Sequence, residues 1–242
     1  MKKVIVVGAT SGIGREVAVK MLERGWLLGI AGRRVEALEE LRKRYPDRVV
    51  VCPVDVMKED AADRLAHLIR LRGRMDLFFL ASGTGSRNVA LEEDIEMRTA
   101  ETNVSGFIRM VTAACRYFAS AGGGHVAVIS SIAGTKGLGA APAYSASKRF
   151  QNTYIDALAQ LSYTRNLHIR FTDIRPGFVD TALLNSKEYR YPMLMRPEKV
   201  AGAIMRALDK RKRVAVIDRR YRVLVFFWRL VPRRLWERMK IG

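Results

Sequence analysis

The stretch that decides the fold runs from residue 4 to residue 14 and reads Val4-Ile5-Val6-Val7-Gly8-Ala9-Thr10-Ser11-Gly12-Ile13-Gly14. Its first four residues form a short β-branched run, which is typical of a strand buried on both faces of a parallel sheet. Residues 15–24 follow with the apolar spacing of an amphipathic helix. Strand, glycine turn and helix in this order predict a phosphate-binding turn, because the glycines let the backbone approach a pyrophosphate at the positive end of the helix.

The glycine spacing separates this turn from the commoner dinucleotide-binding fingerprint. Three residues lie between Gly8 and Gly12, where that fingerprint has one, so the turn is longer and belongs to a different subclass. The residues of the turn that we expect to contact a dinucleotide are Gly8, Thr10, Ser11, Gly12, Ile13 and Gly14. A glycine-rich turn with no ligand is the alternative that this stretch alone leaves open.

Strands and helices alternate along the rest of the chain. Buried strands are expected at 27–31, 49–54, 77–80, 125–129, 168–174 and 214–217. Helices are expected at 35–45, 59–71, 107–121, 150–163 and 197–209. This alternation predicts an α/β fold, a doubly wound parallel sheet of the Rossmann type with helices on both faces. The length of 242 residues suits a single domain of this kind, which we bound at residues 1–218.

The end of the second expected strand carries arginines where a carboxylate would mark an NAD site. The chain reads Ala31-Gly32-Arg33-Arg34, with no acid to accept hydrogen bonds from the adenosine ribose hydroxyls. Guanidinium groups match the additional 2′-phosphate of NADP, and Arg15 lies just past the glycine turn. The sequence therefore favours NADP(H), bound by Arg15, Arg33 and Arg34. Solvated arginines at a helix start are the alternative.

A tyrosine and a lysine lie four residues apart in Tyr144-Ser145-Ala146-Ser147-Lys148, at the head of a run that reads as helix. This spacing puts both side chains on one helix face. A tyrosine loses its proton near pKa ~10, and a positive charge beside it favours the phenolate, so Lys148 can help Tyr144 exchange a proton. The strand at 125–129 closes on Ser130-Ser131, and parallel sheets place their chemistry at such strand ends. Taken alone, the tyrosine and lysine more often mark a solvated helix face.

These motifs occur in the order of a known enzyme family. The series along the chain is Gly8, Gly12, Gly14, Asn103, Ser131, Tyr144 and Lys148. On these residues the chain resembles the short-chain dehydrogenase/reductase family over about residues 3–218. Two positions depart from the usual family pattern. Val7 stands where threonine is usual before the first glycine, and Ala81-Ser82-Gly83 replaces an asparagine-bearing sequence.

The resemblance implies a role for each residue of the catalytic set. Tyr144 would be the general acid/base, Ser131 would orient the substrate oxygen, and Lys148 would lower the tyrosine pKa and hold the nicotinamide ribose. Asn103 would support a water that relays protons to Lys148. The set suits hydride transfer between NADP(H) and a carbonyl or alcohol, since the two hydroxyls can stabilise the oxygen that gathers negative charge. A non-catalytic, NADP-sensing binding protein on the same fold is the competing class.

Further cofactor contacts and an oligomer are also expected. The small residues Ala81, Ser82 and Gly83 at the end of the fourth strand would let the backbone pass beside a cofactor. By the family resemblance, Asp55 and Val56 match the adenine side of the cofactor site. The loop on the nicotinamide side is matched by Pro176, Gly177, Val179 and Thr181. The helix at 150–163 pairs subunits in the resembled family, so we expect a homodimer or homotetramer.

Residues 178–196 form the lid, the segment in which the family varies with its substrate. The large side chains of this lid are Leu183, Leu184, Tyr189, Tyr191, Met193, Leu194 and Met195. Such a lid favours a bulky hydrophobic substrate, for example a sterol, acyl or sphingoid ketone. Packing of these side chains on the protein core is the alternative.

The basic excess of the chain gathers near its end. The formal charge is +19, and residues 196–242 hold 15 Lys and Arg against 4 Asp and Glu. We treat 219–242 as a basic amphipathic segment, in which a helical wheel over 221–240 gathers Arg222, Arg229, Arg233 and Lys240 opposite Leu224, Phe227, Trp228, Val231, Leu235 and Met239. Its apolar run is too short to span a bilayer, so it would lie on an anionic membrane or pack on the protein. Nucleic acid is not an expected partner, because phosphate contact needs no wide apolar face.

Two cysteines, Cys52 and Cys115, lie in apolar surroundings without the spacing of a metal site or a disulfide framework. They fit a reducing compartment, and we expect a cytoplasmic protein that holds no metal. The apolar run near residue 4 imitates a signal peptide, but the glycines from Gly8 onward interrupt it, so no export is expected.

Overall fold

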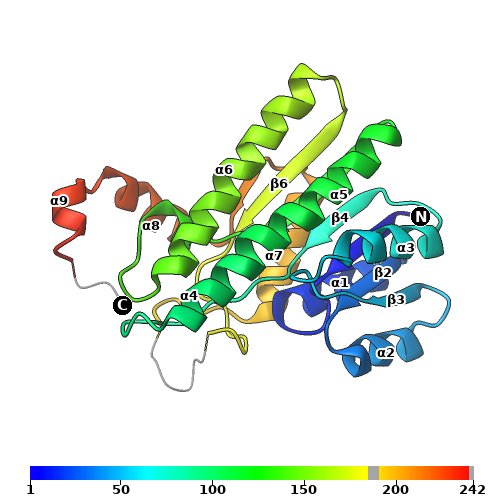
Figure 1. Ribbon diagram of the computed structural model, residues 1–242, viewed down its shortest axis with the longest axis horizontal. Coiled ribbons are helices and arrows are strands. Elements are labelled where there is room, and N and C mark those ends of the chain that lie inside the picture. The colour runs from blue at the N-terminus through cyan, green and yellow to red at the C-terminus, as the bar shows by residue number, and fades with distance from the viewer. Residues whose placement is uncertain (185–190, 240–242) are drawn as a thin grey trace.

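The computed structural model describes residues 1–184 and 191–239, and these residues form one seven-stranded sheet between two layers of helices (Figure 1). The strands lie in the order β3-β2-β1-β4-β5-β6-β7, and every neighbouring pair is parallel. Their bounds are β1 Lys3–Val7, β2 Leu27–Gly32, β3 Val49–Pro53, β4 Leu77–Leu80, β5 Gly124–Ile129, β6 Ile169–Arg175 and β7 Val214–Val216. The order reverses between β1 and β4, and such switch points hold the ligand crevices of open α/β sheets. The predicted doubly wound α/β fold is confirmed.

Two helical layers cover the sheet, and the strands supply side chains to both. One face packs against α1 Gly12–Glu23, α2 Val35–Arg44 and α7 Pro197–Asp209. The other face packs against α3 Ala61–Arg72, α5 Phe107–Ser120 and α6 Pro142–Thr164. Along β1, Val4 and Val6 point into the first core, whereas Ile5 and Val7 point into the second. A strand buried on both sides must be apolar throughout, which explains the continuous β-branched run.

Shorter elements shape the site end of the sheet. Helix α4 Glu93–Ala100 continues through the π-helix η1 Glu101–Gly106 into α5, and the 3-10 helix η2 Ile132–Thr135 follows β5. A π-helical turn inside a longer helix often marks a functional position. Asn103 lies in this turn.

The C-terminal segment, expected to be amphipathic over 221–240, forms two helices that are separated at Pro232. Helix α8 Arg219–Leu230 ends before Pro232, and the short α9 Arg233–Trp236 follows at the far end of the molecule from the N-terminus (Figure 1). Val231 is extended, because the residue before a proline avoids the helical region. The first turns of α8 belong to the core, since Tyr221 and Val225 are buried there. Lys240 lies outside the described residues, and within them no helix has the length and apolarity to cross a membrane.

Candidate active site

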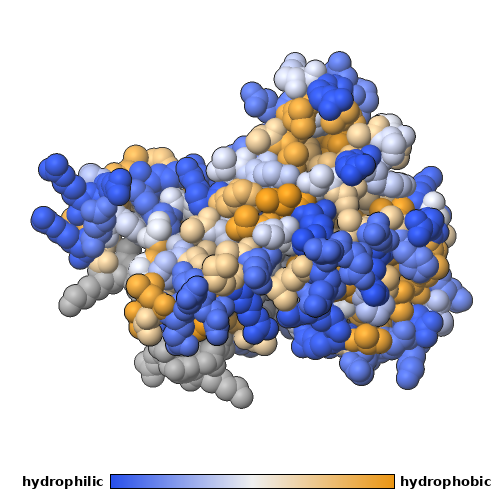
Figure 2. All heavy atoms as spheres, in the orientation of Figure 1, coloured by the Kyte–Doolittle hydropathy of each residue, from blue (hydrophilic) through white to orange (hydrophobic). Residues whose placement is uncertain are grey.

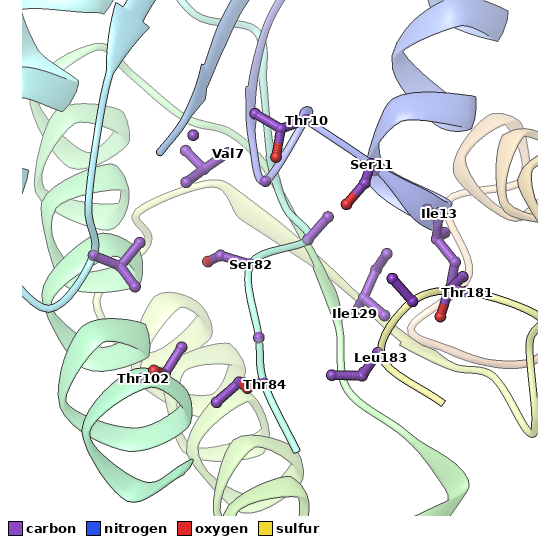
Figure 3. Close-up of a pocket in the computed structure, with 18 of the residues that line it drawn as sticks. Val7, Thr10, Ser11, Ile13, Ser82, Thr84, Thr102, Ile129, Thr181 and Leu183 are labelled. Carbon is purple, nitrogen blue, oxygen red and sulfur yellow. The ribbon is translucent and has the colours of Figure 1, made fainter. Parts of the chain in front are cut away.

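A cavity of about 640 Å³ opens at the carboxyl ends of the strands, at the switch point between β1 and β4 (Figure 3). Loops after β1 to β6 contribute to its wall. Most of the predicted site residues line it: Gly8, Thr10, Ser11, Gly12, Ile13, Gly14, Arg33, Arg34, Asp55, Val56, Ala81, Ser82, Gly83, Ser131, Tyr144, Lys148, Pro176, Gly177, Val179 and Thr181. Two predicted residues do not, because Asn103 is fully buried behind the wall and Arg15 points away.

The glycine turn between β1 and α1 forms a cradle that only glycine permits. Gly8 has φ +91°, and a Cβ there would lie 2.5 Å from the backbone nitrogen of Ser82. A Cβ on Gly14 would lie 2.1 Å from the Gly8 carbonyl oxygen. The turn therefore brings bare backbone and the N-terminus of α1 to the cavity, an arrangement that suits a pyrophosphate. The residues present fit a dinucleotide cofactor.

The three arginines predicted to hold a 2′-phosphate are placed differently. Arg33 and Arg34 are exposed and line the cavity beside the end of β2, and Arg34 donates to the Thr10 hydroxyl at 3.0 Å. Arg15 instead pairs with Glu40 of α2, with Nη2 2.7 Å from the carboxylate oxygen. In this structure Arg15 is thus engaged by an acid on a neighbouring helix and does not reach the cavity.

Tyr144 and Lys148 project from one face of the first turns of α6, as the spacing predicted. The Lys148 Nζ atom lies 5.7 Å from the centre of the Tyr144 ring. Burial raises the pKa of the Tyr144 phenol above its ordinary value, and a hydrogen bond with Ser131 opposes that rise. The family resemblance implied that Lys148 would lower the pKa of Tyr144. Here the net direction of the Tyr144 pKa is upward, because burial is its largest cause. At neutral pH Tyr144 is therefore a phenol that can donate its proton.

Lys148 is buried and held by neutral acceptors. Its ammonium donates to the Ile129 carbonyl at 3.2 Å and to the Gln151 side-chain oxygen at 3.0 Å. Burial lowers the pKa of Lys148 to about 8, and the charge of Asp173 opposes that shift. The lysine remains charged below that pH, beside the tyrosine.

Asn103 connects the loop after β4 to α6. Its side-chain nitrogen donates to the Thr84 carbonyl at 2.6 Å and to the Ser147 hydroxyl at 3.1 Å. Its side-chain oxygen accepts from the Thr84 backbone N–H at 2.9 Å. Its backbone carbonyl accepts from the Gln151 side chain at 2.9 Å. Asn103 therefore acts through its neighbours rather than on the cavity.

The first residues of the lid, in the loop after β6, lie over the cavity. Thr181, Leu183 and Leu184 line it, and Figure 3 shows Thr181 and Leu183 on this loop, across from Ser82. Met195 is instead buried in the core, where it pairs with Val179. Met193 and Tyr191 are half-buried beside it, Leu194 is exposed, and Tyr189 lies outside the described residues.

Comparison with known proteins decides the family. A family model described as short chain dehydrogenase matches residues 2–191. This chain belongs to the short-chain dehydrogenase family. A relative named uncharacterized oxidoreductase, from Myxococcus xanthus (strain DK1622), is 35% identical over 197 residues, which cover 79% of this chain and 77% of that protein. The oxidoreductase class predicted from the motifs is confirmed.

Two solved structures share the fold of this short-chain dehydrogenase. The structure titled ElxO with NADP bound has a TM-score of 0.79 at 20% identity, covering 92% of this chain and 99% of that one. A short-chain dehydrogenase/reductase from Burkholderia phymatum in complex with NAD has a TM-score of 0.82 at 18% identity, covering 93% and 92%. At these identities the likeness establishes the fold alone.

Several polar groups at the site of this short-chain dehydrogenase were missed from the sequence. Thr102 and Arg98 line the cavity from the helix before α5, and Thr84 holds Asn103. Gln151 is fully buried one turn beyond Lys148. A polar amide at that spacing was the signal that could have found it. Among residues 1–184 and 191–239, no group of three or more His, Cys, Asp or Glu is placed to hold a metal ion.

Proposed function

We propose that this short-chain dehydrogenase is an NADP(H)-dependent oxidoreductase that interconverts a carbonyl and an alcohol, with Tyr144 as the general acid/base. The observation that carries the proposal is one cavity lined both by the glycine cradle and by Ser131, Tyr144 and Lys148. A cofactor site and a proton donor thus share one space. The test is NADPH consumption with a panel of ketones, with Tyr144→Phe as the control.

The chemistry follows from the arrangement of these side chains. When bound, the nicotinamide supplies the hydride in reduction and accepts it in oxidation. Ser131 and Tyr144 hydrogen-bond the substrate oxygen, which gathers negative charge during reduction. Tyr144, protonated because burial raises its pKa, then donates its proton to that oxygen. The Lys148 ammonium stabilises the phenolate that remains.

NADP(H) is preferred over NAD(H) in this proposal. Arg33 and Arg34 line the cavity at the end of β2, and guanidinium groups match a phosphate ester better than a ribose hydroxyl. The bound cofactors of the two structural neighbours do not decide the question, since one holds NADP and the other NAD. Titration of both cofactors tests the preference.

The substrate in this proposal is bulky and hydrophobic. Leu183 and Leu184 line the cavity on the lid side, and Leu183 is also partly open to solvent. Apolar side chains beside a few polar groups favour an apolar ligand with one oriented oxygen. Relative rates for bulky and small ketones test this part.

The protein in this proposal is a cytoplasmic homodimer or homotetramer. The end of α6 exposes Leu161 and Tyr163, and the family resemblance implies subunit pairing through this helix. Cys52 and Cys115 are both free thiols, which fits a reducing compartment. Sedimentation of the purified protein tests the oligomeric state.

A peripheral contact with an anionic membrane completes the proposal. The outward face of α8 carries an apolar stripe at helical spacing, in which each side chain is more than half exposed: Val223, Phe226, Phe227 and Leu230. The opposite face is occupied by the core, so this stripe is a separate surface. Exposed apolar groups gathered in one place mark contact sites.

Arginines rim this α8 stripe and give the surface its charge. The exposed arginines of α8 and the residues after it are Arg219, Arg220, Arg222, Arg229, Arg233, Arg234 and Arg238. Two of them are paired, Arg220 with Asp218 and Arg233 with Glu237. Figure 2 shows hydrophilic residues beside hydrophobic ones at this end of the molecule. An apolar stripe with a positive rim complements the acyl boundary and headgroups of an anionic bilayer, and liposome binding tests it.

A further inference from the structure

Gln151 joins the catalytic lysine to the π-helical turn before α5. Its side chain is fully buried on α6, one turn beyond Lys148. The Gln151 Oε1 atom accepts from the Lys148 ammonium at 3.0 Å, and Nε2 donates to the Asn103 carbonyl at 2.9 Å. Both ends of one amide are thus used, one on the lysine and one on a neighbouring helix.

The π-helical geometry of η1 favours this bridge. In a regular α-helix the Phe107 N–H would donate to the Asn103 carbonyl, whereas here it donates to the Val104 carbonyl. A carbonyl oxygen has two lone pairs, and that of Asn103 accepts the amide of Gln151. The Asn103 carbonyl, which the Phe107 N–H does not use, therefore serves as an acceptor for α6 at the level of the active site.

The far side of the bridge is fixed as well. The Asn103 side chain is held by the Thr84 backbone and by Ser147. A continuous chain of hydrogen bonds then runs from the loop after β4 through Asn103 and Gln151 to Lys148. Because all of these groups are fixed by protein atoms, the lysine is held at one place relative to the cavity.

We propose that Gln151 is a positioning residue that fixes the Lys148 ammonium against Tyr144 by direct protein contact. The inference rests on the proposed function, since it assigns how the lysine of that site is held. An amide neither gains nor loses a proton near neutral pH, so Gln151 orients Lys148 without relaying protons to Asn103.

The charge of Lys148 depends on few groups. Tyr144 faces it from the same helix, and Asp173 faces it from β6. Asp173 is itself bound by Arg175 at 2.6 Å and by Ser130 and Asn152. Burial and Asp173 act in opposite directions on the lysine pKa, and the Gln151 oxygen adds a dipole that favours the charged form. Removing that oxygen should make the lysine lose its proton at lower pH.

Two substitutions at position 151 act in opposite directions. Gln151→Met keeps the side-chain length but removes both hydrogen bonds. The pH at which the rate of ketone reduction falls on the alkaline side should therefore move about one unit lower. Gln151→Glu keeps the acceptor and adds a negative charge beside the ammonium. The rate of ketone reduction should therefore fall at a higher pH than in the wild type. Ser162→Ala is the matched control, because it removes a buried hydroxyl on α6 that bonds Ile169 and lies away from the site.

The pH profile separates positioning from a merely structural role. The inference predicts opposite shifts in the Met and Glu variants and no shift in Ser162→Ala, even where all three lose stability. Shifts in the same direction, or none, would overturn it. The pH dependence of NADPH binding is measured in parallel, so a wild-type protein that reduces no ketone refutes the proposed function while the binding profile still tests Gln151. If Gln151→Met does not fold, the isosteric Glu variant decides the question.

Discussion

Lys148 and Tyr144 face each other across one turn of α6, with the ammonium 5.7 Å from the centre of the phenol ring. Burial moves the two pKa values in opposite directions, upward for Tyr144 and downward to about 8 for Lys148. At neutral pH the pair is therefore a phenol beside an ammonium. This state can donate a proton to a substrate oxygen, and the positive charge then stabilises the phenolate.

Replacing Lys148 by Met should stabilise the protein near neutral pH in the absence of cofactor. The unfolded lysine has a pKa of 10.5 and the folded one about 8, so the unfolded chain holds the proton more tightly and wild-type stability rises as pH increases between these values. The difference between the two pKa values corresponds to roughly 3 kcal/mol of unfolding free energy. The variant should gain only part of this amount, because the two acceptors of Lys148 lose their donor. Urea unfolding at pH 7 should show a gain that disappears near pH 10.5. An equal gain at both pH values would contradict the burial of a charged lysine.

Arg33→Ala should remove most of a preference for NADPH over NADH. We expect the wild type to bind NADPH at least ~10-fold more tightly, or about 1.4 kcal/mol, because Arg33 lines the cavity at the end of β2. Arg15→Ala is the matched control, since Arg15 pairs with Glu40 outside the cavity and its loss should leave the ratio unchanged. Equal affinity for both cofactors in the wild type, or an unchanged ratio in Arg33→Ala, would refute the assignment.

Tyr221→Phe should loosen the lid. The Tyr221 hydroxyl accepts from the Phe178 N–H at 3.1 Å and contacts the carbonyls of Pro192 at 2.9 Å and Met193 at 3.1 Å, so one group holds both ends of the lid. Its loss leaves partly buried backbone groups without this partner and should cost about 1 kcal/mol of unfolding free energy.

The kinetic signature of this change distinguishes the lid from simple destabilisation. KM for a bulky ketone should rise in Tyr221→Phe, whereas kcat and NADPH affinity stay close to the wild type. Tyr163→Phe, at the exposed end of α6, serves as the control and should change neither quantity. An unchanged KM with reduced stability would show that Tyr221 supports only the core.

The α8 stripe should bind anionic liposomes in a salt-dependent way. Each arginine near an anionic surface contributes about 1 kcal/mol, so replacing Arg222, Arg229 and Arg233 by Gln should weaken association by roughly 100-fold. The control replaces three basic residues of the last turn of α2, in the segment 42–44, by Gln. Equal weakening by both triple variants, or binding that ignores salt, would show nonspecific attraction to a basic protein.

The parts of the site that the sequence predicted correctly are those fixed by local chemistry. The turn from Gly8 to Gly14 needs its glycines because a Cβ on Gly8 or Gly14 would collide with backbone and Gly12 has a positive φ, and the strand before it and the helix after it were visible as patterns. Tyr144 and Lys148 share a helix face, which spacing alone determines.

The parts that sequence reasoning missed depend on tertiary contacts. Arg15 of α1 pairs with Glu40 of α2, which covers the same face of the sheet, and no local pattern encodes that direction. In α8 a helical wheel cannot tell which apolar residues the core takes, and the core takes Tyr221 and Val225 while Phe227 faces solvent. The upward pKa of Tyr144 comes from burial, which is known only once the loops close around it.

The central claim is that Tyr144 donates a proton during hydride transfer from NADPH. The most direct measurement follows NADPH consumption across a panel of bulky ketones in the wild type and in Tyr144→Phe, with NADPH affinity measured in both. We expect turnover by the wild type, a loss of about 10²- to 10⁴-fold in the variant, and similar NADPH affinity in the two proteins. Equal rates in both proteins would contradict the mechanism, and NADPH binding with no turnover in either would favour a cofactor-sensing protein.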